Sequence, residues 1–267
     1  MRHPVPTGAA SRILARLSRR GRYLAAALLL CATSQCSLAA PAAEAVDSRE
    51  AYSSASPAWL RAVGKLHVPG SRYRAGRREH LQENCSATLV VSGPRQQADT
   101  IITAWHCLAD YDDLSKPITF TLLPELPGAL ERQAYRLADG GGMHADWAIL
   151  RLYQPIAAED IQALAVHQER ASSGREISMA GYSRDAGMGA DGARLTFDRH
   201  CRITEQAAAA SHSDCFAHKG ASGGAVVQIS AEGLALFSGV ISQGNGAGFS
   251  TFVPVTSFRS ALVRHLN

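Results

Sequence analysis

Short apolar or β-branched runs recur along the chain between residues 63 and 253, and turn sequences such as Ser92-Gly93-Pro94 separate them. Short runs bounded by Gly, Pro, Asn and Ser are typical of β-strands. The runs predicted as strands are Val63–Val68, Ala87–Val91, Thr100–Thr103, Ile118–Leu123, Trp147–Leu152, Ile177–Ala180, Ala193–Phe197, Ala225–Ile229, Leu234–Ile241 and Phe249–Val253. Many short strands without an alternating helical pattern predict an all-β fold, either a sandwich or barrels.

The C-terminal segment has a different pattern, because its apolar residues are spaced by four. Phe258, Leu262 and Leu266 would share one face of a helix, and Thr256 or Ser257 can cap its first turn. The pattern predicts one C-terminal helix, over Thr256–Leu266.

The N-terminal segment is typical of an export signal. It is rich in arginine up to Arg22, apolar from Tyr23 to Ala32, and then carries small residues up to Ala40. We expect a signal peptide over residues 1–40, a linker or pro-segment over 41–60 and one two-part domain over 61–267. A retained anchoring helix is the alternative for the leader. No later segment approaches 18 apolar residues, so we expect no membrane anchor after signal removal and a secreted or periplasmic protein.

Removing the leader changes the charge of the protein. The whole chain has 27 Lys and Arg against 23 Asp and Glu, and the leader holds six of the basic residues and none of the acidic ones. The remaining 21 basic and 23 acidic residues give a net charge of −2. Without a basic run, and with only 6% aromatic residues, the chain lacks the features that nucleic-acid binding needs. Nucleic acid is therefore not an expected partner.

Four cysteines remain outside the leader: Cys85, Cys107, Cys201 and Cys215. An even number in an oxidising compartment predicts two disulfides. Three pairings are possible, and the pairing of sequence neighbours closes loops of about 20 and about 15 residues, each stabilising by about 3 kcal/mol. Zinc is the competing interpretation. The sequence has no Cys-x-x-Cys or His-x-x-x-His pair, so we predict no metal site.

Three segments carry candidate chemistry. A predicted strand leads into His106, Asp146 stands at the start of an apolar strand, and Ser222 is enclosed by glycines in Gly220-Ala221-Ser222-Gly223-Gly224. A serine hydroxyl is a weak nucleophile, so acyl transfer needs an imidazole to accept its proton and a carboxylate to orient that imidazole. Glycines let backbone N–H groups approach a developing oxyanion, and the expected donors are the amides of Gly220 and Ser222.

These segments resemble those of the trypsin- and chymotrypsin-like serine peptidases. Thr103-Ala104-Trp105-His106-Cys107 is similar to their Thr-Ala-Ala-His-Cys, 146–150 to their Asp-Ile-Ala-Leu-Leu, and 220–224 to their Gly-Asp-Ser-Gly-Gly. The order His, Asp, Ser also agrees, and it differs from the order in subtilisins and α/β-hydrolases. The resemblance, which runs from about Val63 to the C-terminus, implies two packed six-stranded antiparallel β-barrels with a C-terminal helix.

The resemblance also implies roles for further residues. Cys85 would bridge to Cys107 beside His106, and Cys201 to Cys215, as in secreted bacterial relatives. Ser242 would hydrogen-bond near Asp146, and the backbone from Ser242 to Gly244 would pair with an extended substrate. Phe216, Ala217 and Ser250 would line a small or apolar specificity pocket, with ordinary core as the alternative for Phe216.

Three departures from the family pattern limit what the resemblance implies. Ala221 replaces the aspartate before the serine, so a new N-terminus cannot form the usual activating ion pair. Phe216 stands where trypsins carry a pocket-floor aspartate, so no preference for Arg or Lys is indicated. Ile241 stands where glutamyl endopeptidases carry a substrate-reading histidine.

Two functions of different class follow from these observations. The first is an exported serine endopeptidase, a monomer without cofactors, acting on a peptide or protein substrate through His106, Asp146 and Ser222. The second is a catalytically silent protein on the same scaffold that binds extended peptides by strand addition along 242–244. The presence of all three catalytic side chains favours the first.

Overall fold

Residues 46–266 are described by the structure, which is a computed structural model. The predicted signal peptide and its two cysteines lie outside the described residues, as does the first part of the predicted linker. None of the helices within 46–266 has the length and apolarity that a membrane crossing requires.

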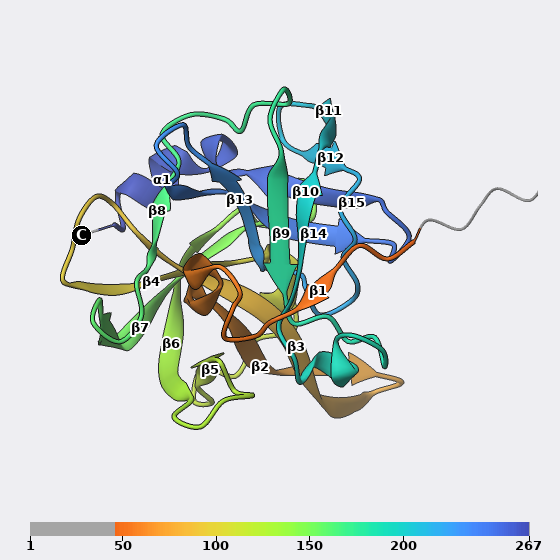
Figure 1. The fold of residues 1–267 in the computed structure, drawn as a ribbon. Helices are drawn as coiled ribbons and strands as arrows, with labels where there is room; N and C mark the ends of the chain where they lie inside the picture. Colours follow the sequence, from red (N-terminus) through yellow and green to blue (C-terminus); the bar gives the residue numbers. More distant parts are fainter. Residues whose placement is uncertain (1–45, 267) are drawn as a thin grey trace, which may run out of the picture. The chain divides into compact units, whose positions relative to one another are not determined.

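Six antiparallel strands form a closed barrel in the N-terminal half (Figure 1). Hydrogen bonds run in the order β3-β2-β5-β6-β7-β4 and return from β4 to β3. In β5 the apolar residues Ile118, Phe120 and Leu122 are buried and the threonines between them are half-buried, as the two-residue period of a strand requires. The six strands are β2 (Val63–Arg74), β3 (Arg77–Val91), β4 (Gln97–Thr103), β5 (Ile118–Leu122), β6 (Leu130–Asp139) and β7 (Ala148–Ala157).

The C-terminal half holds a second set of strands. Hydrogen bonds connect β10-β9-β13-β14-β15-β12-β11. The chain passes from β10 to β11 at Arg202, but within residues 46–266 these two strands do not pair, so hydrogen bonds do not close this set as they close the first barrel. We call this set the second barrel. These strands are β9 (Ile177–Gly181), β10 (Thr196–Cys201), β11 (Ile203–Gln206), β12 (Ser211–Ser213), β13 (Ala225–Ile229), β14 (Ala235–Gly244) and β15 (Ser250–Pro254). The predicted all-β architecture is confirmed.

Two short strands join these parts. β8 (Leu164–Val166) pairs in parallel with β3 and with β14, so it connects the first barrel to the second. β1 (Glu50–Ala51) pairs with β10 and so attaches the N-terminal segment to the second barrel. Part of the predicted linker or pro-segment therefore has regular structure, and the 3₁₀ turn η1 (Ala58–Ala62) follows it.

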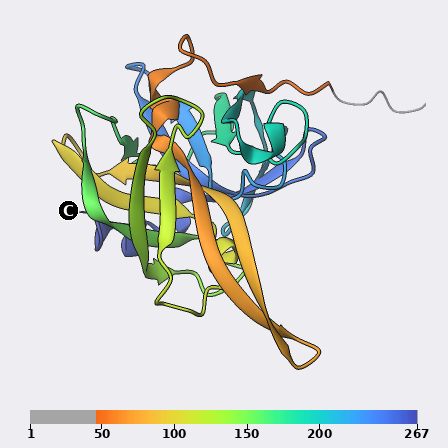
Figure 2. The same cartoon turned by 90° about the horizontal axis from the view of Figure 1, so that it is seen from below.

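The structure contains elements that the hydrophobic pattern did not indicate. The β2–β3 hairpin continues to the pair Arg74↔Arg77 and projects beyond the barrel as a long polar ribbon (Figure 2). β6 was not predicted because Ala134 is its only fully buried residue. The C-terminal helix α1 (Arg259–Val263) is shorter than expected and follows the 3₁₀ turn η4 (Val255–Ser257). Phe258 and Leu262 nevertheless both face the core, as their spacing predicted.

Candidate active site

His106 and Asp146 are brought together by the pairing of β4 with β7. These strands are in register at Thr103↔Ala148, so the 3₁₀ turn η2 (Trp105–Leu108), which follows β4, lies beside the residues that precede β7. The His106 backbone amide donates to Asp146 Oδ1 at 2.9 Å, and His106 Nδ1 lies 2.9 Å from Asp146 Oδ2. One carboxylate thus fixes both the backbone and the ring of the histidine.

Asp146 is 1% exposed and accepts a third hydrogen bond, at 2.5 Å from the hydroxyl of Ser242. Burial by itself raises the pKa of this carboxyl, but the hydrogen bonds and charge of His106 and the hydrogen bond from Ser242 hold the pKa below its usual value of 3.8. Asp146 is therefore ionised at neutral pH. A buried carboxylate bonded to Nδ1 leaves Nε2 as the ring nitrogen that can accept a proton.

Both predicted disulfides are present. Cys85 pairs with Cys107, with Cα atoms 6.2 Å apart, and Cys201 pairs with Cys215, with Cα atoms 5.1 Å apart. Ligand atoms of Cys85, His106 and Cys107 lie within 4.8 Å of one another. Because the two sulfurs are bonded to each other, neither is a free thiolate, and this cluster does not fit a zinc ion. The first bridge instead ties η2 to β3.

Ser222 lies in the loop between β12 and β13, and this loop is held by the first barrel. The amide of Ser86, in β3, donates to the carbonyl of Ser222 at 2.8 Å. The Ser86 hydroxyl donates to the carbonyl of Gly220 at 2.9 Å and accepts from the amide of Tyr182 at 2.8 Å. Ser86 is fully buried. In the sequence, this contribution of Ser86 is indicated only by its position next to Cys85.

The loop around Ser222 depends on a glycine at position 220. Gly220 has a φ of +97°, and a Cβ there would lie 2.5 Å from the carbonyl oxygen of Tyr182, so only glycine fits. Within residues 46–266, the amides of Gly220 and Ser222 donate to no protein acceptor. Two neighbouring N–H groups without internal partners are available to an oxygen of a bound substrate.

His106 and Ser222 line one surface cavity of about 440 Å³, which also contacts Ser242 and Gly244. The Ser222 hydroxyl donates to the carbonyl of Ser242 at 3.3 Å, and in the described part of the chain no hydrogen bond joins it to His106. The remaining lining residues are Met143, His218, Lys219, Ile241 and Gln243. Phe216 and Ala217, predicted to line a pocket, are 7% and 2% exposed and do not contact this cavity.

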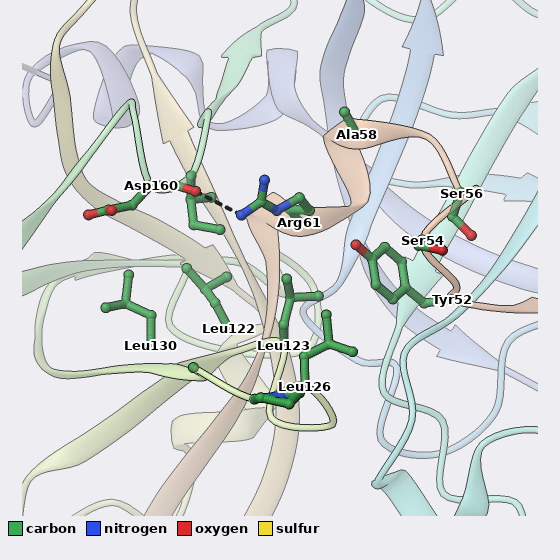
Figure 3. A pocket seen from close by; sticks show the side chains of 13 residues that line it. Tyr52, Ser54, Ser56, Ala58, Arg61, Leu122, Leu123, Leu126, Leu130 and Asp160 are labelled. Carbon is green, nitrogen blue, oxygen red and sulfur yellow. Dashed lines mark hydrogen bonds between the residues drawn. The ribbon is translucent and has the colours of Figure 1, made fainter.

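A second large cavity, of about 580 Å³, lies between the N-terminal segment and the β5–β6 loop (Figure 3). Its floor is aliphatic, with Leu122, Leu123 and Leu130, and Arg61 on its wall donates to the carbonyl of Asp160 at 2.9 Å. None of the predicted site residues lines it. The predicted catalytic residues His106 and Ser222 line the smaller of these two cavities.

Residues 86–236, just over half of the chain, match the family of trypsin-like peptidase domains. The chain belongs to the trypsin-like peptidase family. Among solved structures, it is similar to protease Anisep from Arthrobacter nicotinovorans, with 18% sequence identity and a TM-score of 0.57 over 80% of this chain and 99% of that chain. This similarity concerns the fold. No curated protein matches the chain significantly in sequence.

Membership of the trypsin-like peptidase family agrees with the sequence resemblance and supports a peptidase function. The two disulfides fit a protein that resides outside the cytoplasm.

Proposed function

We propose that this protein is an exported serine endopeptidase in which His106, Asp146 and Ser222 form a catalytic triad. The observation that carries the proposal is the convergence on one cavity of the His106–Asp146 pair and Ser222. The two unpartnered amides beside the serine add to it. A trypsin-like peptidase domain supplies the reaction class.

In the proposed reaction, an extended substrate lies along Ser242–Gly244 and places its carbonyl carbon near Ser222. The Ser222 hydroxyl turns from the Ser242 carbonyl toward His106 Nε2, a rotation about one single bond. His106 takes the hydroxyl proton as Oγ attacks the carbonyl carbon, and Asp146 stabilises the imidazolium that results.

The amides of Gly220 and Ser222 would stabilise the tetrahedral oxyanion. His106 then gives its proton to the leaving amine, and the C–N bond breaks to leave an acyl group on Ser222. Water, deprotonated by His106, attacks the acyl-enzyme and releases the carboxylic acid while Ser222 recovers its proton. Each donor to the oxyanion contributes about 3 kcal/mol of transition-state stabilisation in enzymes of this kind.

Export is also part of the proposal. The Arg-rich and then apolar leader over residues 1–40 is typical of a removable signal, and two disulfides form readily only in an oxidising compartment. A secreted or periplasmic monomer acting on peptides or proteins is the form that we expect. Intact mass measurement of the protein recovered from its producing cells would locate the mature N-terminus.

The decisive experiment is covalent labelling of the oxidised, mature protein with a small fluorophosphonate. We expect one phosphonyl group on Ser222, located by peptide mass mapping. Ser222→Ala should abolish the label, whereas Ser86→Ala, which keeps the nucleophile, should slow it only partly. If the folded protein with both bridges does not react, the peptidase proposal fails and the silent peptide-binding protein is the better interpretation.

A further inference from the structure

The loop that follows β14 touches the segment that precedes Ser222. The amide of Gly246 donates to the carbonyl of Ala217 at 3.0 Å. A Cβ placed on Gly244 would lie 2.2 Å from that same carbonyl oxygen and 2.7 Å from the Ala217 side chain. The backbones of the two segments are therefore in direct contact beside the nucleophile.

This contact leaves no slot between the two segments. An inserted side chain needs about 3.5 to 4 Å to the atoms on each of its two sides, so the backbones would have to stand roughly 7 to 8 Å apart. The hydrogen bond from Gly246 to Ala217 requires them to be much closer. The cavity at Ser222 accordingly contacts His218 and Gly244 but not Ala217.

The ring of Phe216 packs against the loop that follows β14, at Gly248. This side chain is 7% exposed, and its ring lies 3.3 Å from the position that a Cβ on Gly248 would occupy. The Phe216 amide donates to the buried carboxylate of Asp198 at 2.7 Å. Asp198 in turn accepts from the hydroxyl of Ser48, in the N-terminal segment, at 2.9 Å. Because its ring packs against the loop after β14 and its amide is bonded to Asp198, Phe216 is held in place beneath the surface.

We propose that the protein cleaves after residues with small side chains, namely Gly, Ala and Ser. This inference rests on the proposed function, because it concerns the residue whose carbonyl Ser222 attacks. The side chain of that residue points to the contact between 217 and 244–246, where a hydrogen atom, a methyl group or a hydroxymethyl group fits and a branched, aromatic or long charged side chain does not.

The inference is tested with a series of tripeptide diphenyl phosphonates that differ only in the residue bound to Ser222. The series contains Gly, Ala, Leu, Phe, Lys and Glu at that position, and the second-order rate of Ser222 labelling is measured by mass spectrometry. We expect the Ala probe to react at least tenfold faster than the Leu, Phe, Lys and Glu probes, since steric exclusion from a closed site exceeds the effect of one missing methylene.

A pair of matched variants sharpens this test. Phe216→Ala removes the ring that packs against Gly248, so the loop after β14 can move away from Ala217, and the variant should raise the rate of the Leu or Phe probe at least tenfold relative to the Ala probe. Phe249→Ala makes the same change at an exposed neighbouring position, 45% exposed, and should leave the ratios unchanged. Circular dichroism in the near ultraviolet checks that both variants fold, and the wild-type series does not depend on either variant.

The outcomes separate this inference from the proposed function. If the small fluorophosphonate labels Ser222 but the Phe, Lys or Glu probe reacts as fast as the Ala probe, the closed-site inference is wrong and the serine peptidase stands. If no probe labels Ser222, including the small fluorophosphonate, both fail. Faster labelling by Ala and Gly probes, with the expected change in Phe216→Ala, supports both.

Discussion

The two barrels contribute different halves of the site and are stabilised differently. The first supplies His106 and Asp146 from the segments that follow β4 and precede β7, beside a core that includes Leu66, Phe120 and Ile101, all fully buried. The interior of the second includes the smaller apolar cluster around Met179 and Phe252 and contains the Cys201–Cys215 bridge.

The two barrels also differ in what their buried charged residues do. Within residues 46–266, three charged residues are buried: Arg49, Asp146 and Asp198. Asp146 belongs to the site, whereas the other two attach the N-terminal segment to the second barrel. Arg49 pairs with Asp47 at 2.7 Å and with Asp185 at 2.8 Å.

These ionic contacts lead to the nucleophile loop. Asp185 accepts from the amide of Gly189, within the loop 183–192. In the same loop the amide of Arg184 donates to the carbonyl of Lys219, next to Gly220. His106 and Asp146 therefore depend on an apolar core, whereas the Ser222 loop depends both on Ser86 of the first barrel and on the polar attachment of the N-terminal segment. Loss of the N-terminal attachment should therefore affect the Ser222 loop and leave the first barrel intact.

The largest effect is expected from Asp146→Asn. The amide can no longer stabilise the imidazolium and favours the wrong tautomer of His106, so kcat should fall about 10⁴-fold. The rate of peptide hydrolysis at saturating substrate measures this fall in kcat. Hydrogen exchange in the second barrel should be unchanged, and a loss of protection there would contradict the separation of the two halves.

Next in size is Arg49→Met, which removes the cation of the N-terminal attachment. Breaking a buried ion pair by removing one partner costs several kcal/mol, and because both carboxylates keep some solvent contact we expect the free energy of unfolding to fall by about 3 kcal/mol. Urea denaturation measures this change. Hydrogen exchange should show loss of protection in 183–192 and 214–222 and none in the first barrel.

The matched control for this variant is Arg199→Met. Arg199 pairs with Glu50 on the same N-terminal segment at 2.6 Å, but its side chain is 38% exposed. An exposed pair contributes less than about 1 kcal/mol. Equal destabilisation by the two variants would show that burial of Arg49 is not what matters.

A smaller effect is expected from Ser242→Ala, which removes one of three hydrogen bonds to the Asp146 carboxylate. A hydrogen bond to a charged group contributes about 1.5 to 3 kcal/mol, so kcat should fall at least roughly tenfold. Because this hydrogen bond is buried, the free energy of unfolding should also fall, by about 1.5 to 3 kcal/mol. An unchanged kcat would mean that His106 alone orients the carboxylate.

The smallest expected effect is a loss of stability at low pH that depends on Asp185. Burial raises the pKa of Asp185, but hydrogen bonds from Arg49 and the Gly189 amide lower it more, to about 2 in the folded protein against 3.8 ordinarily. A lowered folded-state pKa stabilises above the unfolded value, and that stabilisation is lost as pH falls from about 4 to 2. Urea midpoints across this range should fall less steeply for Arg49→Met than for the wild type. If the urea midpoints of the two proteins fall equally steeply with pH, Asp185 does not help to attach the N-terminal segment.

Much of the fold was predictable where burial alternates cleanly, as in β5, and where consecutive apolar residues are buried, as at the start of β7. The polar hairpin beyond Pro69 and strand β6 were missed because their residues face solvent on both sides or nearly so. Of the site, the three catalytic candidates and both cysteine pairs were predicted. The buried hydroxyl of Ser86 and the attachment through Arg49 were not, since each depends on partners more than 90 residues away.

The amino-acid sequence by itself determined which chemical groups are available: a histidine beside a cysteine, an aspartate before an apolar strand, and a serine among glycines. These are local properties, set by side-chain chemistry and by the conformations that short segments allow. Only the tertiary structure decided that these groups meet, that Ser86 holds the serine loop, and that Ala217 lies against Gly244. The first two contacts arise from the packing of one barrel on the other and the third from packing within the second barrel, and no single segment specifies any of them.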